Sequence, residues 1–101
     1  MSQISDWDAF HDTFAATLGF PGFYGRNMDA WIDCITSADQ DDGMTAVTVA
    51  AGDVLTLQLE DCNTFRARCP DIYAKLIECA AFVNWRRIEV GERAIVALSF
   101  P

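Results

Sequence analysis

The chain is poor in positive charge, and one long stretch of it has none. Its 101 residues hold 7 lysines and arginines against 15 aspartates and glutamates, a formal net charge of -8. Residues 27–65 contain no base and eight acids, namely Asp29, Asp33, Asp39, Asp41, Asp42, Asp53, Glu60 and Asp61. An acidic surface repels nucleic acid and anionic membranes and attracts basic molecules. We therefore expect a basic protein as the partner, and neither nucleic acid nor a membrane.

Long apolar runs and a signal sequence are also missing. No apolar stretch approaches the roughly 20 residues that a transmembrane helix needs. Residues 1–6, Met-Ser-Gln-Ile-Ser-Asp, have neither a basic region nor an apolar core. We expect a cytoplasmic protein in which residues 1–101 form a single domain. The sequence leaves the oligomeric state open.

Metal-binding and disulfide patterns are absent as well. The four cysteines, Cys34, Cys62, Cys69 and Cys79, form no C-x-x-C pair, so we expect small buried side chains rather than zinc ligands or a disulfide frame. In the acidic run 39–43 the glycine comes one position too early for an EF-hand loop. We expect no metal and no cofactor.

Recognisable catalytic motifs are also missing from the sequence. The single histidine, His11, has no serine or cysteine partner nearby in the sequence, and we interpret it as a surface or structural residue. The chain has no Gly-rich phosphate loop, no H-E-x-x-H and no nucleophile elbow. We therefore expect a protein that is not an enzyme.

The sequence does contain a regular succession of helix and strand patterns. Apolar periodicity and capping residues predict helices over 6–18, 28–37, 62–68 and 71–84. Alternating or continuous apolar residues predict strands over 46–49, 53–60 and 93–100, with a hairpin turn at 50–52. Residues 85–91 fit a strand or an extended connection. The order α-α-β-β-α-α-β predicts an α/β fold, a small sheet of about three strands packed against helices.

Two of these elements are expected to be deeply buried. The helix at 71–84 is apolar over much of its surface and is predicted to be the central buried element. The nearly continuous apolar run in the last strand is typical of an interior strand covered on both faces.

Residues 20–36 are the most informative stretch, because an aromatic turn leads into a short helix with two aspartates. At 100° per residue, Asp29, Asp33 and Thr36 fall on one side of this helix, and Ile32 lies at the border. The core-facing stripe consists of Met28, Trp31 and Ile35. Like charges one turn apart destabilise a helix by a few tenths of a kcal/mol, and no base within the helix compensates them.

Two interpretations of this helix remain open from the pattern alone. It is either a solvated acidic face or a docking helix that presents carboxylates to arginines or lysines of a partner. Of the adjacent Phe23 and Tyr24, one ring is expected in the core and the other in solvent, where it would anchor an interface. The basic pair Arg86 and Arg87 is interpreted as solvating a helix end or pairing with Glu89.

The run from Pro21 to Thr36, Pro-Gly-Phe-Tyr-Gly-Arg-Asn-Met-Asp-Ala-Trp-Ile-Asp-Cys-Ile-Thr, resembles the barstar family. This family consists of small intracellular protein inhibitors of secreted bacterial ribonucleases such as barnase. Weaker similarity extends over the first helix, Leu55 to Phe65, Tyr73 to Glu78 and the last strand.

The resemblance implies a barstar-like fold and a protein that blocks a ribonuclease active site. It implies that Asp33 enters that site in place of a substrate phosphate and that Asp29 contacts basic residues of the enzyme. Phe23 stands where the family has a tyrosine that packs on the enzyme, and Ile32 where the archetype has a tryptophan. The further candidate contact residues are Tyr24, Gly25, Asn27, Thr36 and Glu78.

Besides Ile32, the chain departs from the family pattern in its length and its strands, and the connection 85–93 is longer than in the family. The family's usual first strand is missing before the helix at 6–18, and the segment 37–59 is longer, with its strand at 46–49 as a replacement. The loss of the aromatic residue at Ile32 keeps an alternative open, a non-nuclease protein-binding adaptor that retains the barstar fold.

Overall fold

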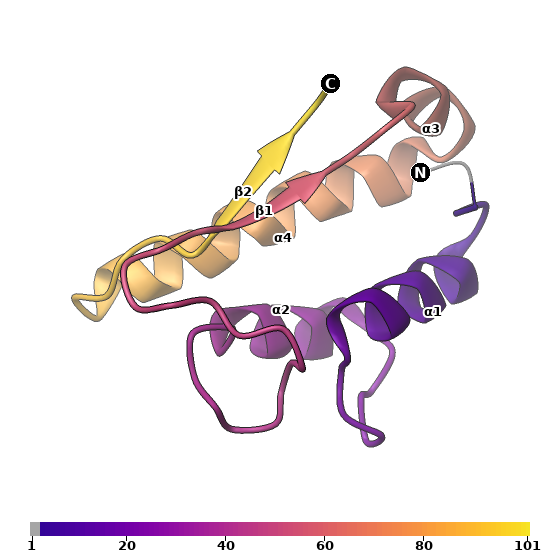
Figure 1. Cartoon of the computed structure of the whole chain (residues 1–101). Coiled ribbons are helices and arrows are strands. Elements are labelled where there is room, and N and C mark those ends of the chain that lie inside the picture. The colour runs from indigo at the N-terminus through magenta and orange to yellow at the C-terminus, as the bar shows by residue number, and fades with distance from the viewer. Residues whose placement is uncertain (1–2) are drawn as a thin grey trace.

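A computed structural model describes residues 3–101, which form four helices and two strands. In chain order these are α1 (Trp7–Leu18), α2 (Met28–Thr36), β1 (Leu55–Gln58), α3 (Cys62–Arg68), α4 (Pro70–Glu89) and β2 (Val96–Ser99). The strands pair in parallel, with Leu55 opposite Val96. Figure 1 shows α4 running alongside both strands, with α1 and α2 below them. The predicted α/β fold is confirmed, with one strand fewer than expected.

The first two helices begin and end at residues that satisfy free backbone groups. The side chain of Asp6 accepts a hydrogen bond from Ala9 N–H, and that of Asn27 accepts one from Ala30 N–H, each at 2.8 Å. Gly19 ends α1 in the left-handed conformation, with φ at 66°. Because these signals are local, the predicted boundaries of both helices are correct to within one residue.

Residues 46–49 form no strand, so the predicted strand and its hairpin are wrong. Their backbone groups bond to helix ends instead of to β1. Ala46 N–H donates to Leu18 O at 2.9 Å, and Val49 N–H donates to Ala38 O at 2.8 Å, just beyond α2. The carbonyls at a helix C-terminus lack partners within the helix. Docking of the segment 46–49 on these carbonyls therefore replaces strand pairing.

Helix α4 is longer than predicted, because it continues through Glu89 where a strand or an extended connection was expected. The buried guanidinium of Arg87 fixes this last part. It donates to the backbone oxygens of Thr36 and Arg93 at 2.8 and 2.7 Å and pairs with Asp39 at 2.8 Å. The Arg87 hydrogen bond lowers the pKa of the Asp39 carboxyl. These contacts join the ends of α2 and α4 and the segment before β2.

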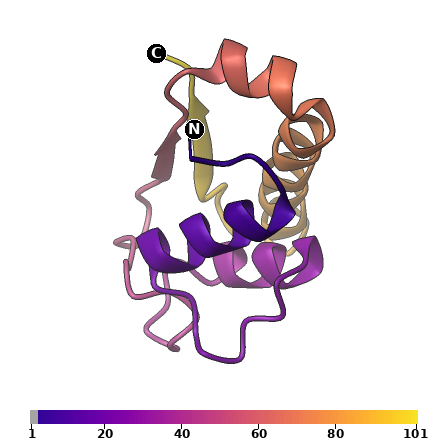
Figure 2. The same ribbon diagram turned by 90° about the vertical axis from the view of Figure 1, so that its right-hand side faces the viewer.

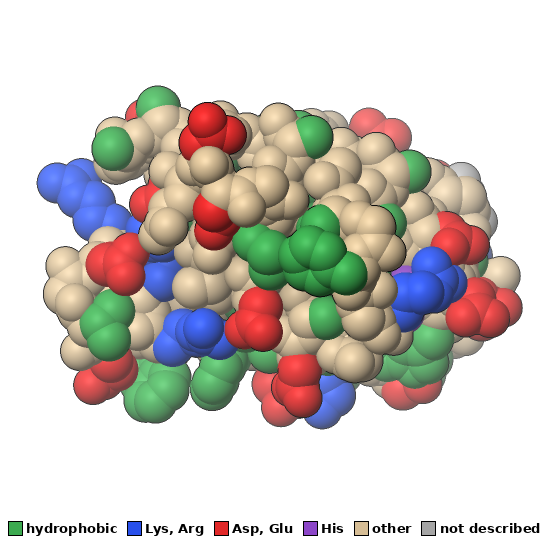
Figure 3. Space-filling view, turned by 90° about the horizontal axis from the view of Figure 1, so that it is seen from below, with side chains coloured by type: hydrophobic (Ala, Val, Ile, Leu, Met, Phe, Trp, Pro, Cys, Tyr) green, Lys and Arg blue, Asp and Glu red, His purple; other side chains and the backbone are tan. Residues whose placement is uncertain are grey.

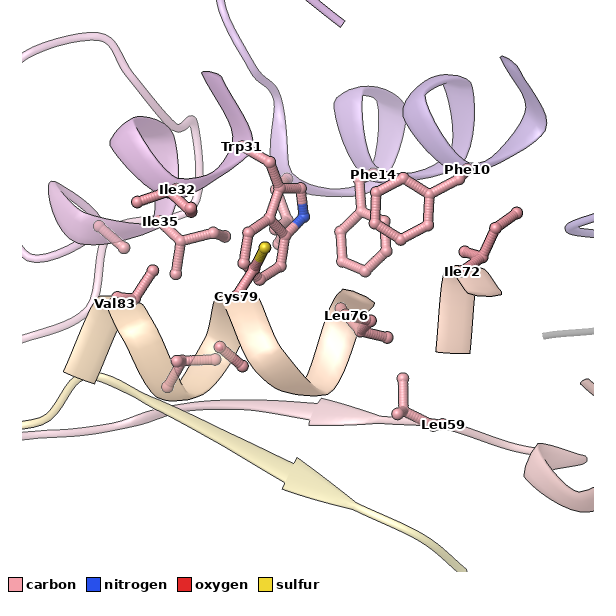
Figure 4. Close-up of a cluster of buried hydrophobic side chains, with 14 of the residues drawn as sticks. Phe10, Phe14, Trp31, Ile32, Ile35, Leu59, Ile72, Leu76, Cys79 and Val83 are labelled. Carbon is pink, nitrogen blue, oxygen red and sulfur yellow. The ribbon is translucent and has the colours of Figure 1, made fainter. Parts of the chain in front are cut away.

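The core lies where α1 and α2 pack against α4. Figure 4 shows side chains from all three helices meeting there, among them Phe10, Phe14, Trp31, Ile32, Ile35, Ile72, Leu76, Cys79 and Val83. Three of the four free cysteines are buried and Cys62 is half-buried, in line with the prediction of small buried side chains. Burial raises the pKa of the Cys34 thiol to about 11, and Asp33 and Asp42 add to that shift.

Two predicted burial patterns are wrong. Helix α4 buries one stripe only, and its outer side exposes Phe82, Trp85 and Ile88. In β2, Val96 is buried while its neighbour Ala97 is exposed, so only one face of that strand is covered. Both errors have one cause, since an apolar run indicates burial without showing how many elements surround it.

Candidate partner-binding site

The turn before α2 divides its two aromatic rings between the core and the solvent. Tyr24 contacts the rings of Phe20 and His11, and a hydrogen bond of 2.6 Å joins its hydroxyl to His11 Nδ1. The Phe23 side chain, by contrast, is 79% exposed. The expected division of the pair is confirmed, and Phe23 is the ring that a partner could reach.

His11 is a buried structural residue that holds this turn. Burial lowers its pKa below the ordinary value, and the charge of Arg26 adds to that shift against the opposing effect of Asp8 and Asp12. Burial also raises the pKa of the Tyr24 hydroxyl. Both groups therefore stay uncharged at neutral pH, which suits a hydrogen bond inside the protein.

The base nearest to α2 in the sequence is neutralised by α1. Arg26, with φ at 55°, pairs with Asp12 at 2.7 Å and with Asp8 at 3.5 Å. On either side of it, Gly25 and Asn27 are exposed. The Asn27 amide also donates to Gly25 O at 3.4 Å, so this residue shapes the turn as well as capping the helix.

Helix α2 exposes its two aspartates and turns its other candidate residues inward. Asp29 and Asp33 are both exposed. Ile32, predicted at the border between the two faces, is only 8% exposed and belongs to the core. Thr36 is half-buried, and its hydroxyl donates to Ile32 O at 2.6 Å. The structure therefore makes Asp29 and Asp33 accessible, but not Ile32.

Asp33 has a partner that the sequence did not reveal. Arg86 of α4 pairs with it at 3.2 Å, and the two side chains are 39% and 60% exposed respectively. Arg86 and Arg87 lie in the last turn of α4, as expected of bases at a helix end, but they pair with Asp33 and Asp39 and not with Glu89. The sequence of α2 reveals only partners within that helix, three or four residues away, and Arg86 comes from another helix. Within residues 3–101, Asp29 forms no ion pair.

Glu78 lies on α4, the helix against which α2 packs. Burial raises the pKa of the Cys79 thiol on the same helix, the charge of Lys75 opposes this shift, and Glu78 and Asp29 add to it. Glu78 is exposed and pairs with Lys75 at 3.4 Å.

Most of the candidate residues are exposed on the surface, whereas Ile32 lies in the core. A hollow of about 390 Å³ between α1 and β1 contains none of them. Figure 3 shows the molecule from below, where acidic side chains are spread among arginine and lysine side chains instead of forming one acidic block. Among the described residues there is no group of three or more potential metal ligands, and no helix is long and apolar enough to cross a membrane.

A family model described as barstar (barnase inhibitor) matches residues 1–97 of the chain. No curated protein and no solved structure matches.

Proposed function

The chain belongs to the barstar family, and from that premise we propose that it inhibits a basic, barnase-like ribonuclease by covering its active site with α2. The observation that carries the proposal is the exposure of Asp29 and Asp33 on one side of α2, next to the 79% exposed ring of Phe23. Two carboxylates and one aromatic anchor make a compact recognition surface.

The chemistry of the proposed contact is mimicry of RNA phosphate. A carboxylate presents two acceptor oxygens that arginine can bind in bidentate fashion, as it binds a phosphate. Asp33 would occupy the phosphate position, while Asp29 and Glu78 would meet other basic groups around it. The single domain, residues 1–101, would act in the cytoplasm by occupying the active site, without catalytic residues or a cofactor of its own.

The ion pair with Arg86 is compatible with this role. Both side chains are substantially exposed, and pairs of this kind contribute only about 0–1 kcal/mol to stability. A guanidinium of the enzyme can therefore replace Arg86 at Asp33 at small cost, and it gains a stronger contact because the interface excludes water.

An inhibition assay with barnase-like ribonucleases tests the proposal. Asp33→Ala should weaken inhibition about 30-fold or more, since truncating one partner of a buried interfacial charge pair costs about 2–5 kcal/mol, a general range that already includes the barnase–barstar complex. Asp53→Ala removes another exposed charge, from a loop, and serves as the matched control. Equal inhibition by wild type and Asp33→Ala would show that the mechanism is wrong.

A second candidate function is a protein-binding adaptor with a non-nuclease partner. Two observations favour it, the burial of Ile32 at the border of the acidic side and the partial neutralisation of Asp33 by Arg86. The two functions differ in what the immobilised protein retains from its source cells. A small basic ribonuclease supports the inhibitor, whereas a different protein whose capture depends on Asp33 supports the adaptor.

A further inference from the structure

The outer side of α4 carries an exposed apolar surface that the proposed function does not use. Ile77, Phe82, Trp85 and Ile88 are 36%, 44%, 56% and 58% exposed respectively, and we call them the outer face of α4. The rings of Phe82 and Trp85 contact each other, with centroids 5.6 Å apart. Neighbouring apolar side chains left in water on one helix mark a protein interaction site.

No other element of the described chain covers this face. Figure 2 shows α4 nearly end-on at the right-hand side of the molecule, with the strands to its left and α1 and α2 below it. The inward stripe of the helix consists of Ile72, Leu76, Cys79, Ala80, Val83 and Arg87. The outer face points away from the strands, where a second protein has room to dock.

The charges beside the outer face are arranged symmetrically about Phe82. Lys75 and Glu89 lie seven residues before and after it, and Glu78 and Arg86 lie four residues before and after it. At these spacings the five side chains follow one stripe of the helix. Each of these two positive charges therefore has a negative charge on the other side of Phe82, at the same number of residues from it.

This pattern is complementary to itself in antiparallel order. If two copies of α4 pair about a two-fold axis at Phe82, Lys75 of each copy faces Glu89 of the other, and Glu78 faces Arg86. In a parallel pair, each charged residue would instead lie beside the same residue of the other copy, which carries the same charge. In an isologous interface the same surface meets itself, and this charge order satisfies that condition.

We propose that the outer face of α4 binds a second copy of this chain, forming an antiparallel helix pair centred on Phe82. Phe82 and Trp85 supply the apolar contact, and the charges on the same stripe as Phe82 set the direction of the helices. The ion pairs of Lys75 with Glu78 and of Arg86 with Asp33 are exposed, so both cations can also reach the second copy at small cost. This surface shares Glu78 with the candidate ribonuclease contact, and its Arg86 also pairs with Asp33 of that contact.

Sedimentation equilibrium at low salt, from micromolar to millimolar protein, tests the proposal. The wild type should form a dimer as concentration rises, and Trp85→Glu should raise the dimer Kd about 30-fold or more, because buried Trp residues dominate such interfaces. Val54→Glu changes a side chain that is 49% exposed ahead of β1 and should leave the Kd unchanged. A protein that stays monomeric throughout, including one whose outer face binds a different protein, would overturn the proposal.

A charge exchange tests the antiparallel order independently of the apolar contact. Lys75→Glu and Glu89→Lys should each raise the dimer Kd about threefold to tenfold, since two attractive pairs become repulsive at an exposed edge. The double variant restores opposite charges in both pairs and should return the Kd to near the wild-type value. A double variant as weak as the singles would contradict the antiparallel pairing. Circular dichroism of each variant confirms that the fold is retained.

Discussion

The Arg86–Asp33 ion pair sets how much negative charge α2 presents to a partner. Both side chains are exposed, so the pair contributes little to folding, about 0–1 kcal/mol. It nevertheless places a positive charge beside the carboxylate that is proposed to enter the enzyme. Arg86 therefore acts mainly on recognition, by competing with cationic groups of the partner for Asp33.

Replacing this arginine should strengthen binding to a basic ribonuclease. Arg86→Gln frees Asp33 and makes the surface around α2 more negative, so the association rate and the affinity should both rise several-fold at low salt. Stopped-flow binding measures both quantities. Arg66→Gln on α3 makes the same change in net charge and should have a smaller effect. Weaker binding of Arg86→Gln would mean that Arg86 itself contacts the partner.

His11 makes the stability of the fold depend on pH in mild acid. Its pKa is lowered in the folded protein, so below the ordinary value of 6.5 the unfolded chain takes up the proton first. Stability should therefore fall as the pH drops through 6.5 towards the folded-state pKa, and this contribution is constant above that range. Urea unfolding at a series of pH values should show this slope for the wild type and a flatter one for His11→Gln. Identical slopes would contradict the assignment.

Among the structural elements, the end of α1 fixes the path of the long segment before β1. Gly19 is left-handed, and a Cβ there would collide with the Cβ of Ala46, whose N–H bonds Leu18 O. Gly19→Ala should lower the free energy of unfolding by about 1–2 kcal/mol or more, from backbone strain alone. Gly22→Ala, where a Cβ meets nothing within 4 Å, should be nearly neutral. Urea unfolding measures the free energy of unfolding of both variants, and equal stability of the two would rule out this role of Gly19.

Elements defined by neighbouring residues could be predicted, whereas those defined by distant partners could not. Apolar periodicity and caps gave α1 and α2 nearly correctly, because both signals lie within the helix itself. The segment 46–49 has a strand-like sequence, but its backbone bonds are made with helix ends that only the fold brings close. The last turn of α4 likewise depends on contacts of Arg87 with Thr36 and Asp39, which are far away in the sequence.

The same distinction holds for the candidate site. The exposure of Asp29 and Asp33 follows from helical periodicity, and the division between Phe23 and Tyr24 follows from the divergence of adjacent side chains. Arg86 at Asp33 was missed because it comes from another helix. Ile32 was placed at a border, and packing of α2 on α4 decided that it is buried.

Across the whole molecule, the charge imbalance in the sequence is only partly an imbalance in space. The stretch 27–65 has no base of its own, yet Arg86 and Arg87 of α4 pair with two of its aspartates. The net charge of -8 still attracts a basic partner over long range. Specific binding must therefore depend on which carboxylates are accessible, and not on total charge alone.

Calorimetric titration of a barnase-like ribonuclease with two charge-matched double variants tests this account most directly. Asp29→Asn with Asp33→Asn changes the α2 surface, whereas Asp41→Asn with Asp53→Asn removes the same charge from exposed loop positions. We expect the first to weaken binding about 100-fold or more and the second to change it less than about threefold, because only the first removes interfacial charge pairs. Equal losses in both variants would mean that net charge, and not the acidic side of α2, accounts for binding.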